Sequence, residues 1–267
     1  LEGALEGGGA TVQVPGFQDR LSQARASFIT TPEHIEAEMR LSSEMFGELQ
    51  WDGTYAVAGR HVRGVLWLDV PHAVANLAPE GRLGSLAGSA LQPYRQSTFE
   101  VEAVLPGGTG EQPYVSLARQ GEPPVQARAD LVQDSGGVRP DSIQASATLP
   151  LEGLAQALPP ALDVSGAALL SFERAPGETG YTARVDLQPA GFQVGSYVSK
   201  APGQSASVLV QGGGPESVWA PEAVTVALLG ESIRAGITGE GVHAEDIALG
   251  LAAWTPLLPE QASADGR

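Results

Sequence analysis

The chain has 267 residues, and 42% of them are hydrophobic, so it is long and apolar enough to bury a substantial core. Its formal net charge is −16, with 31 acidic against 15 basic residues, and such a surface repels both phosphate backbones and anionic lipid surfaces, which argues against a nucleic-acid partner. It contains no cysteine, which excludes disulfides, thiolate nucleophiles and sulfur-ligated metals.

The remaining composition favours many short strands joined by tight turns, because glycine (34) and proline (20) are frequent and aromatic residues make up only 6%. No apolar run approaches the roughly 20 residues of a membrane-spanning helix. The chain starts at Leu1 without an initiator methionine or a signal peptide. We expect it to be a segment of a longer protein whose anchor lies elsewhere.

The first third of the chain alternates between apolar and polar residues, which predicts strands with one dry face. The clearest run is 34–41, where Ile35, Met39 and Leu41 share one side. A helix is the alternative there, because it would pair Glu36 with Arg40. The other strands predicted in this part, after a glycine-rich start, are 10–14, 21–29, 47–57 and 60–70.

Two turn signals interrupt this part of the chain. Asp52-Gly53 predicts a turn or a bulge within 47–57, and Gly59-Arg60 predicts a hairpin before the next strand.

The middle of the chain starts with a loop at 80–97 that holds at most one helical turn. Strands are then predicted at 99–105, 114–118, 125–131 and 143–149, with a turn at Asp134-Ser135-Gly136-Gly137 before the last of them.

The second half repeats this pattern. Pro176-Gly177 predicts a hairpin between strands at 164–172 and 181–187, and Pro202-Gly203 predicts another between 192–198 and 206–210. Further strands are predicted at 224–228, 233–237 and 242–249, followed by a flexible tail at 261–267.

One unit occurs three times: a strand, a short apolar helix and a closing proline, at 65–79, 143–159 and 247–259. In 143–159, Pro150 ends the strand, and Leu151, Leu154 and Leu158 fall on one side of a helix. These units predict one elongated domain over 1–260, built of loose repeats at approximately 1–80, 81–160 and 161–260. Chance is the alternative, because leucine and proline are common here.

The pattern as a whole predicts a mainly β fold: a long, curled antiparallel sheet that forms an open groove, with a few short helices. The dry faces are rich in alanine and small apolar residues, which suits a sheet curled around a space. A β-sandwich is the alternative, because a closed core needs the same alternation.

No catalytic constellation stands out in the sequence. The four histidines lack metal-ligand spacing, and His34 and His61 fall on the polar sides of their strands. The glycine runs lack dinucleotide or phosphate-loop spacing, and no nucleophile elbow is present. The four tryptophans are scattered and form no visible sugar-stacking platform. We therefore expect neither an enzyme nor a metal or cofactor site.

Three segments carry a resemblance to a known family: HVRGVLWLDVPHAVANLAP (61–79), VRPDSIQASATLPLEGLAQALPPALDVSGAALL (138–170) and GVHAEDIALGLAAWTPLLPE (241–260). They resemble repeats of the AsmA-like superfamily, which includes the TamB, YhdP and YdbH types. Those repeats also run strands into a short apolar helix that ends near Leu-Pro.

The resemblance implies a periplasmic lipid-transport protein of the cell envelope, tethered to the inner membrane and active in outer-membrane biogenesis. Its β-groove would carry phospholipid, or another acyl-chain lipid, between the inner and outer membranes. The partners would be that lipid and the remainder of a longer, membrane-anchored chain. The residues expected to line the groove are Ile35, Met39, Leu41, Leu66, Leu68, Phe99, Val101, Val185, Leu187, Val224, Val226, Ile233 and Ile237.

Two other classes remain open from the sequence. One is a closed β-sandwich with a structural or adhesive role in a secreted or cell-envelope protein, in which the dry faces pack against each other. The other is a carbohydrate-active enzyme.

Overall fold

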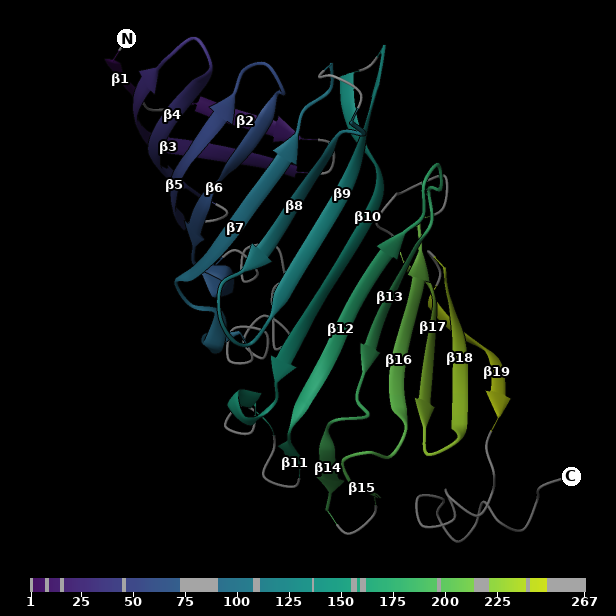
Figure 1. Ribbon diagram of the computed structural model, residues 1–267. Helices are drawn as coiled ribbons and strands as arrows, with labels where there is room; N and C mark the ends of the chain where they lie inside the picture. Colours follow the sequence, from purple (N-terminus) through teal and green to yellow (C-terminus); the bar gives the residue numbers. More distant parts are fainter. Residues whose placement is uncertain are drawn as a thin grey trace, which may run out of the picture. The chain divides into compact units, whose positions relative to one another are not determined.

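The computed structural model describes residues 2–7, 10–14, 17–44, 47–72, 91–107, 111–135, 137–154, 158, 162–195, 198–213, 221–238 and 241–248 (Figure 1). Its elements are almost all β-strands, so the mainly β prediction is confirmed. The chain divides into two compact units, Leu1–Ala147 (unit 1) and Thr148–Arg267 (unit 2). The predicted three loose repeats stay a prediction.

Unit 1 holds one antiparallel sheet in which nearly every strand pairs with its neighbours in sequence. The order is β1-β3-β4-β5-β6-β7-β8-β9-β10, and β2 pairs with the other half of the long strand β3. No described residue of β10 pairs with β1, so this sheet is not closed. Its strands are β1 (Glu2–Gly7), β2 (Ala10–Val14), β3 (Phe17–Thr30), β4 (His34–Ser43), β5 (Gly47–Ala56), β6 (His61–Leu68), β7 (Ser97–Val104), β8 (Tyr114–Arg119), β9 (Val125–Asp134) and β10 (Gly137–Pro150).

Unit 2 contains a main antiparallel sheet, in the order β12-β13-β16-β17-β18-β19, and a small sheet in the order β11-β14-β15. The main sheet is made of β12 (Ala167–Arg174), β13 (Tyr181–Asp186), β16 (Ala206–Gly212), β17 (Pro221–Leu228), β18 (Glu231–Thr238) and β19 (Gly241–Ala248). The small sheet is made of β11 (Leu162–Ser165), β14 (Gly191–Val194) and β15 (Val198–Lys200).

Several turn predictions are confirmed. The β5–β6 hairpin turns at residues 57–60, where Arg60 has a φ of 50°, and the β12–β13 hairpin contains Gly177 with a φ of 72°. Glycine reaches such positive φ values without a steric cost, which explains why Pro176-Gly177 signals a turn. Pro150 is the last residue of β10, as its missing amide hydrogen predicted.

Three predictions, one of a turn or bulge and two of strands, are wrong. Asp52-Gly53 makes neither a turn nor a bulge, because β5 runs through it and pairs with β4 without a register shift. The predicted strand 164–172 is divided at Gly166, whose φ is 78°, so that β11 and β12 join different sheets. The segment 192–198 does not pair with β16. Instead β16 pairs with β13 and β17, where its valines meet apolar partners, and β14 pairs with β11 and β15.

Helical structure is sparse in the described part of the chain. Two 3-10 turns are present, η1 (Gln92–Tyr94) and η2 (Glu152–Leu154), and residues 70–72 are also helical. The turn η2 lies where a short helix was predicted after Pro150, and η1 lies within the predicted loop 80–97. Other predictions lie mostly or wholly outside the described residues. These are the helical runs after residue 72 and after residue 250, the end of the helix predicted after Pro150, and the flexible tail at 261–267.

The small sheet of unit 2 is fixed by the chain's only lysine. Lys200 is 2% exposed, and its Nζ donates to the carbonyl oxygens of Gln188, Ala190 and Ala201. Burial lowers the pKa of Lys200, which the nearby carboxylate of Asp186 partly opposes. The side chain therefore ties the loop after β13 to the end of β15.

Few side chains are buried in the part of the chain that the structure describes. In unit 2, Leu151, Ala168 and Ala190 form a buried cluster. In unit 1, the buried apolar side chains are Tyr94, Phe99, Ala103 and Val104. Most apolar side chains on the described strands are instead only half-buried.

Candidate functional site

The sheet of unit 1 has one continuous apolar face. Residues that are paired across antiparallel strands project to the same side, so the register assigns each side chain to a face. Polar side chains occur on this face only near strand ends, among the residues whose side chains are described. The apolar face of unit 1 is formed by Ala24, Ala26 and Phe28 (β3), Ile35, Ala37, Met39 and Leu41 (β4), Leu49, Trp51, Gly53 and Tyr55 (β5), Val62, Gly64, Leu66 and Leu68 (β6), Phe99, Val101 and Ala103 (β7), Val115 and Leu117 (β8), Val125, Ala127 and Ala129 (β9), and Ile143, Ala145 and Ala147 (β10).

All the residues of unit 1 that were expected to line a groove lie on this face. One cross-strand row joins Met39, Trp51, Leu66 and Phe99 on successive strands. Met39 is 38% exposed, whereas most of its neighbours are half-buried. The described strands of unit 1 form a single sheet and not the two facing sheets of a sandwich. The apolar face is therefore a surface with side chains still partly open to solvent.

Aromatic rings lie flat on this face because glycines leave room beneath them. A Cβ built on Gly53 would be 2.4 Å from Trp51 Cζ2, and one built on Gly64 would be 2.5 Å from Trp51 Cη2. Gly53 and Gly64 are cross-strand partners, so the indole of Trp51 covers both. A flat ring adds apolar area without rising far above the backbone. The ring of Trp51 therefore packs on the backbone in the middle of the face.

A charged side chain, that of Arg119, lies at the end of the face formed by β7 and β8. Arg119 pairs with Phe99 in register and donates to the Oγ of Ser97 at 3.0 Å and to the carbonyl oxygens of Pro93 at 3.0 Å and Pro123 at 2.6 Å. Its guanidinium lies 5.0 Å from the ring centroid of Tyr94.

Burial raises the pKa of Tyr94, although the charge of Arg119 opposes this shift. Phe99, at the same end, is only 3% exposed. Phe99 therefore belongs to the packed end of the face and offers little surface to a guest.

The main sheet of unit 2 also has an apolar face. One of its rows joins Val185, Val208, Val226 and Ile233, and Val226 is 45% exposed. The rings of Phe172 and Tyr181 stack on the same face with centroids 5.3 Å apart. The members of this face are Leu170, Phe172, Tyr181, Ala183, Val185, Ala206, Val208, Val210, Val224, Val226, Leu228, Ile233, Ala235 and Ile237.

The expected groove residues of unit 2 divide into two groups. Val224, Val226, Ile233 and Ile237 lie on the face just described. Val185 lies on it too, but packs together with Leu187 against the buried cluster of unit 2. Leu187 follows the end of β13, and its amide donates to the carbonyl of Ala206. The expected groove residues of β17 and β18 thus lie outside the buried cluster.

The opposite face of the unit 1 sheet is polar and is held by side-chain hydrogen bonds. Glu102 Oε1 accepts from Arg63 Nε at 2.8 Å and from Arg63 Nη2 at 2.6 Å, and it lies 3.1 Å from His61 Nε2. The hydrogen bonds from Arg63 lower the pKa of Glu102. On the next strands, Arg128 covers the ring of Tyr114 at 4.1 Å. His61 thus projects to the polar side, as predicted.

His34 also lies on the polar face. Its Nε2 is 3.3 Å from Glu36 Oε1, and its backbone amide donates to Thr31 Oγ1 at 3.1 Å. In the described part of the chain, no group of three or more His, Cys, Asp or Glu side chains is arranged to hold a metal ion.

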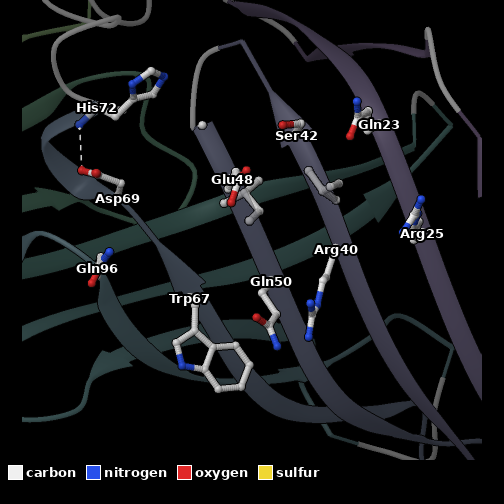
Figure 2. Close-up of a pocket in the computed structure, with 13 residues that line it drawn as sticks. Gln23, Arg25, Arg40, Ser42, Glu48, Gln50, Trp67, Asp69, His72 and Gln96 are labelled. Atoms are coloured by element: carbon white, nitrogen blue, oxygen red, sulfur yellow. Dashed lines mark hydrogen bonds between the residues drawn. The ribbon is translucent and has the colours of Figure 1, made fainter.

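A cavity of about 870 Å³ lies over β3 to β6 (Figure 2), and residues of the polar face line it together with Leu41 and Leu49 of the apolar face. Its lining includes Arg25, Arg40, Gln50 and Trp67, which form one cross-strand row. Sequence reasoning missed this site. The available signal was that Arg40, Gln50 and Trp67 all alternate with the apolar positions of their strands, but the strand pairing was needed to bring them together.

Comparisons with protein-family models, with curated proteins and with solved structures find no match to this chain. Among the described residues, no helix has the length and the apolar content to cross a membrane.

Proposed function

We propose that the protein is a non-enzymatic lipid conduit, in which the apolar faces of the sheets carry the acyl chains of phospholipid between the inner and outer membranes. It works in the periplasm as part of a longer chain tethered to the inner membrane. The observation that supports this proposal is the continuous apolar face of unit 1, which extends over β3 to β10 and keeps side chains such as Met39 partly exposed.

The energetics fit a carrier better than a tight binding site. Exposing an acyl chain of about 16 carbons to water costs on the order of 12 kcal/mol, at about 0.8 kcal/mol per methylene. An apolar face of small aliphatic side chains and flat rings offsets that cost along its whole length. It offers no polar group at its centre that would hold a lipid at one position, since the described polar side chains on it lie near strand ends.

The two faces have the chemistry that a conduit in water needs. The polar face of unit 1 remains solvated and is stabilised by its own ion pairs, such as Arg63 with Glu102. The net charge of −16 keeps such molecules apart and reduces association through their apolar faces.

The proposal is tested by mass spectrometry of the purified protein, under native conditions and after organic extraction. We expect bound phospholipid, and we expect Met39→Glu and Val226→Glu to reduce its amount. Both side chains are already partly exposed, so a charge there leaves the fold intact. Thr54→Glu and Ser171→Glu are matched controls, because Thr54 and Ser171 are exposed on the polar sides of β5 and β12.

The proposal is wrong if no lipid co-purifies or can be loaded, or if the charged variants carry as much lipid as the controls. Turnover of a glycan panel by the same preparation would instead favour the carbohydrate-active enzyme.

A further inference from the structure

One end of the unit 1 sheet carries exposed aliphatic side chains. The turns that join β5 to β6, β7 to β8 and β9 to β10 lie at the same end of the strands, because consecutive strands are antiparallel (Figure 1). Each turn has one exposed aliphatic residue in it or close beside it. Val57 is 42% exposed, Leu105 is 36% exposed and Val138 is 53% exposed. We call these three side chains the apolar rim.

The first two residues of the apolar rim extend the apolar face of unit 1. Val57 is two residues after Tyr55, and Leu105 is two residues after Ala103, both of which lie on that face. The backbone amides of Val57 and Leu105 each donate to a backbone carbonyl of an adjacent turn at 2.9 Å, so the strand ladders continue to these residues. Alternation therefore places both side chains on the apolar side of the sheet.

The third residue lies on a hairpin that extends beyond the neighbouring strand. Among the described residues, β8 pairs with β9 only as far as Asp130, and most of residues 131–140 form a two-stranded ribbon. Val138 pairs with Gln133, which is four residues after Ala129 on β9, so Val138 lies on the side of the apolar face. A two-stranded ribbon offers few partners for burying an apolar side chain, which explains the exposure of Val138.

The opposite end of the strands differs. There Tyr94 and Phe99 are only 2% and 3% exposed, next to the guanidinium of Arg119. Of the large apolar residues that are exposed on this side of the described sheet, Met39 is in the middle, and the other three form the apolar rim. Exposed apolar surface of this face is thus concentrated at the hairpin end, and such surface marks a site of interaction.

We propose that the apolar rim contacts the surface of a zwitterionic lipid bilayer, and that phospholipid passes over the rim between the bilayer and the apolar face. This inference rests on the proposed function, and it adds the place where lipid enters and leaves unit 1. The rim is continuous with the face proposed to carry acyl chains, so a chain that crosses it stays in contact with apolar side chains.

The charge of the chain decides between the possible occupants of the rim. A net charge of −16 repels an anionic bilayer and also a second copy of this chain, whereas neutral headgroups impose no such cost. Beside Val138, Arg139 Nε donates to Asp134 Oδ2 at 2.8 Å. The two charges at the tip of this hairpin therefore compensate each other where it approaches the headgroups.

The contact is tested with an environment-sensitive fluorescent dye on single cysteines of the full chain, which has no native cysteine. The variants are Val138→Cys and, as a matched control, Ile29→Cys. Ile29 is 46% exposed at the same end of the sheet, but it pairs with Glu36 and so lies on the polar face. On addition of phosphatidylcholine vesicles, we expect a blue shift of the dye at residue 138 and none at residue 29. Phosphatidylglycerol vesicles at low salt should give a smaller shift.

The passage of lipid is tested by the rate at which pyrene-labelled phosphatidylcholine moves from vesicles to the full chain. A triple variant with Val57→Asp, Leu105→Asp and Val138→Asp should slow this transfer about tenfold, because carboxylates resist entry into an apolar environment. Ile29→Asp should transfer lipid at the wild-type rate. The amount of lipid loaded from detergent should be the same in all of them, and circular dichroism establishes that each variant is folded.

Several results overturn this inference. These are no spectral shift at residue 138, equal shifts at residues 138 and 29, a larger shift with phosphatidylglycerol, and an unchanged transfer rate in the folded triple variant. A chain that takes up no phospholipid even from detergent contradicts the proposed function and this inference with it. A chain that takes up phospholipid equally fast with and without the apolar rim contradicts this inference alone.

Discussion

The two faces of the unit 1 sheet share the same strands and the same backbone hydrogen bonds, yet the side chains on each face make different kinds of contact. On the polar face, the side chains pair with one another, as in the contacts of Glu102 with Arg63 and His61. On the apolar face, most of the described side chains are half-buried, and Phe99 and Ala103 of β7 are among the few that are buried.

This difference shows where the stability of the sheet comes from. A sheet with few buried side chains gains little from core packing, so backbone ladders, cross-strand pairs and a few packed points contribute more of its stability. The apolar face is then available to a guest. Substitutions that break the packed points should therefore be costly, whereas substitutions in the open part of the apolar face should change occupancy and leave the fold intact.

The largest loss of stability is expected where the apolar face is most tightly packed, under Trp51. A Cβ on Gly53 would lie 2.5 Å from the carbonyl oxygen of Arg63 and 2.8 Å from the Cα of Gly64. Backbone atoms of a neighbouring strand cannot easily move, so Gly53→Val should destabilise the protein by about 2–3 kcal/mol. Urea unfolding measures this change. Gly59→Ala is the control, because the nearest atom to a Cβ on Gly59 is 4.0 Å away and the change should have little effect. Equal midpoints for the two variants would contradict the flat packing of Trp51.

An intermediate effect should distinguish the same residue type on the two faces. Arg119→Met removes three hydrogen bonds at the end of the apolar face and leaves the carbonyls of Pro93 and Pro123 without this donor, so we expect a loss of about 2 kcal/mol. Arg128→Met removes an exposed pair with Asp130 and the contact with the ring of Tyr114 on the polar face, and should cost about 1 kcal/mol. Thermal or urea unfolding of both variants measures the difference. A larger loss for Arg128 would reverse the comparison.

The smallest effect concerns the acid side of the stability profile. Arg63 lowers the pKa of Glu102, so the folded protein binds fewer protons than the unfolded chain near pH 4.5, the ordinary value for this carboxyl group. This contribution is fully present at neutral pH and is lost as the pH falls below 4.5 through the lowered pKa of the folded state. Glu102 is partly exposed, so this contribution to the free energy of unfolding should be under about 1 kcal/mol.

Arg63→Gln should therefore make the fall in stability below pH 4.5 shallower than in the wild type. Arg184→Gln is the control with the same change in net charge. Parallel profiles for the wild type and Arg63→Gln, measured by urea unfolding over this pH range, would show that the pair contributes nothing.

Alternation along the strands was sufficient to predict the fold class and the faces. Residues that are two apart in a strand share a side, so Met39 and Leu41 had to lie together whatever their partners were. For the same reason, the sequence placed His34 and His61 on the polar side without knowledge of the pairing.

Features that depend on pairing could not be predicted. Asp52-Gly53 was interpreted as a turn or a bulge, because nothing local shows that the ring of Trp51 lies above Gly53 and above Gly64. The register that places Trp67 beside Gln50 and Arg40 depends on which strands are neighbours, so the cavity over β3 to β6 was missed. Strand β16 pairs with β13, which is not its neighbour in the sequence, so a local hairpin signal could not predict this pairing.

The central claim is that a lipid acyl chain lies on the apolar face and not on the polar one. Its most direct test uses the absence of native cysteine: single Met39→Cys and Thr54→Cys variants carry the same spin label on opposite faces of one sheet. With phospholipid bearing a paramagnetic group near the end of its acyl chain, we predict strong dipolar coupling to the label at residue 39 and little at residue 54. Equal coupling at both positions, or none at residue 39 in lipid-loaded protein, would contradict the account.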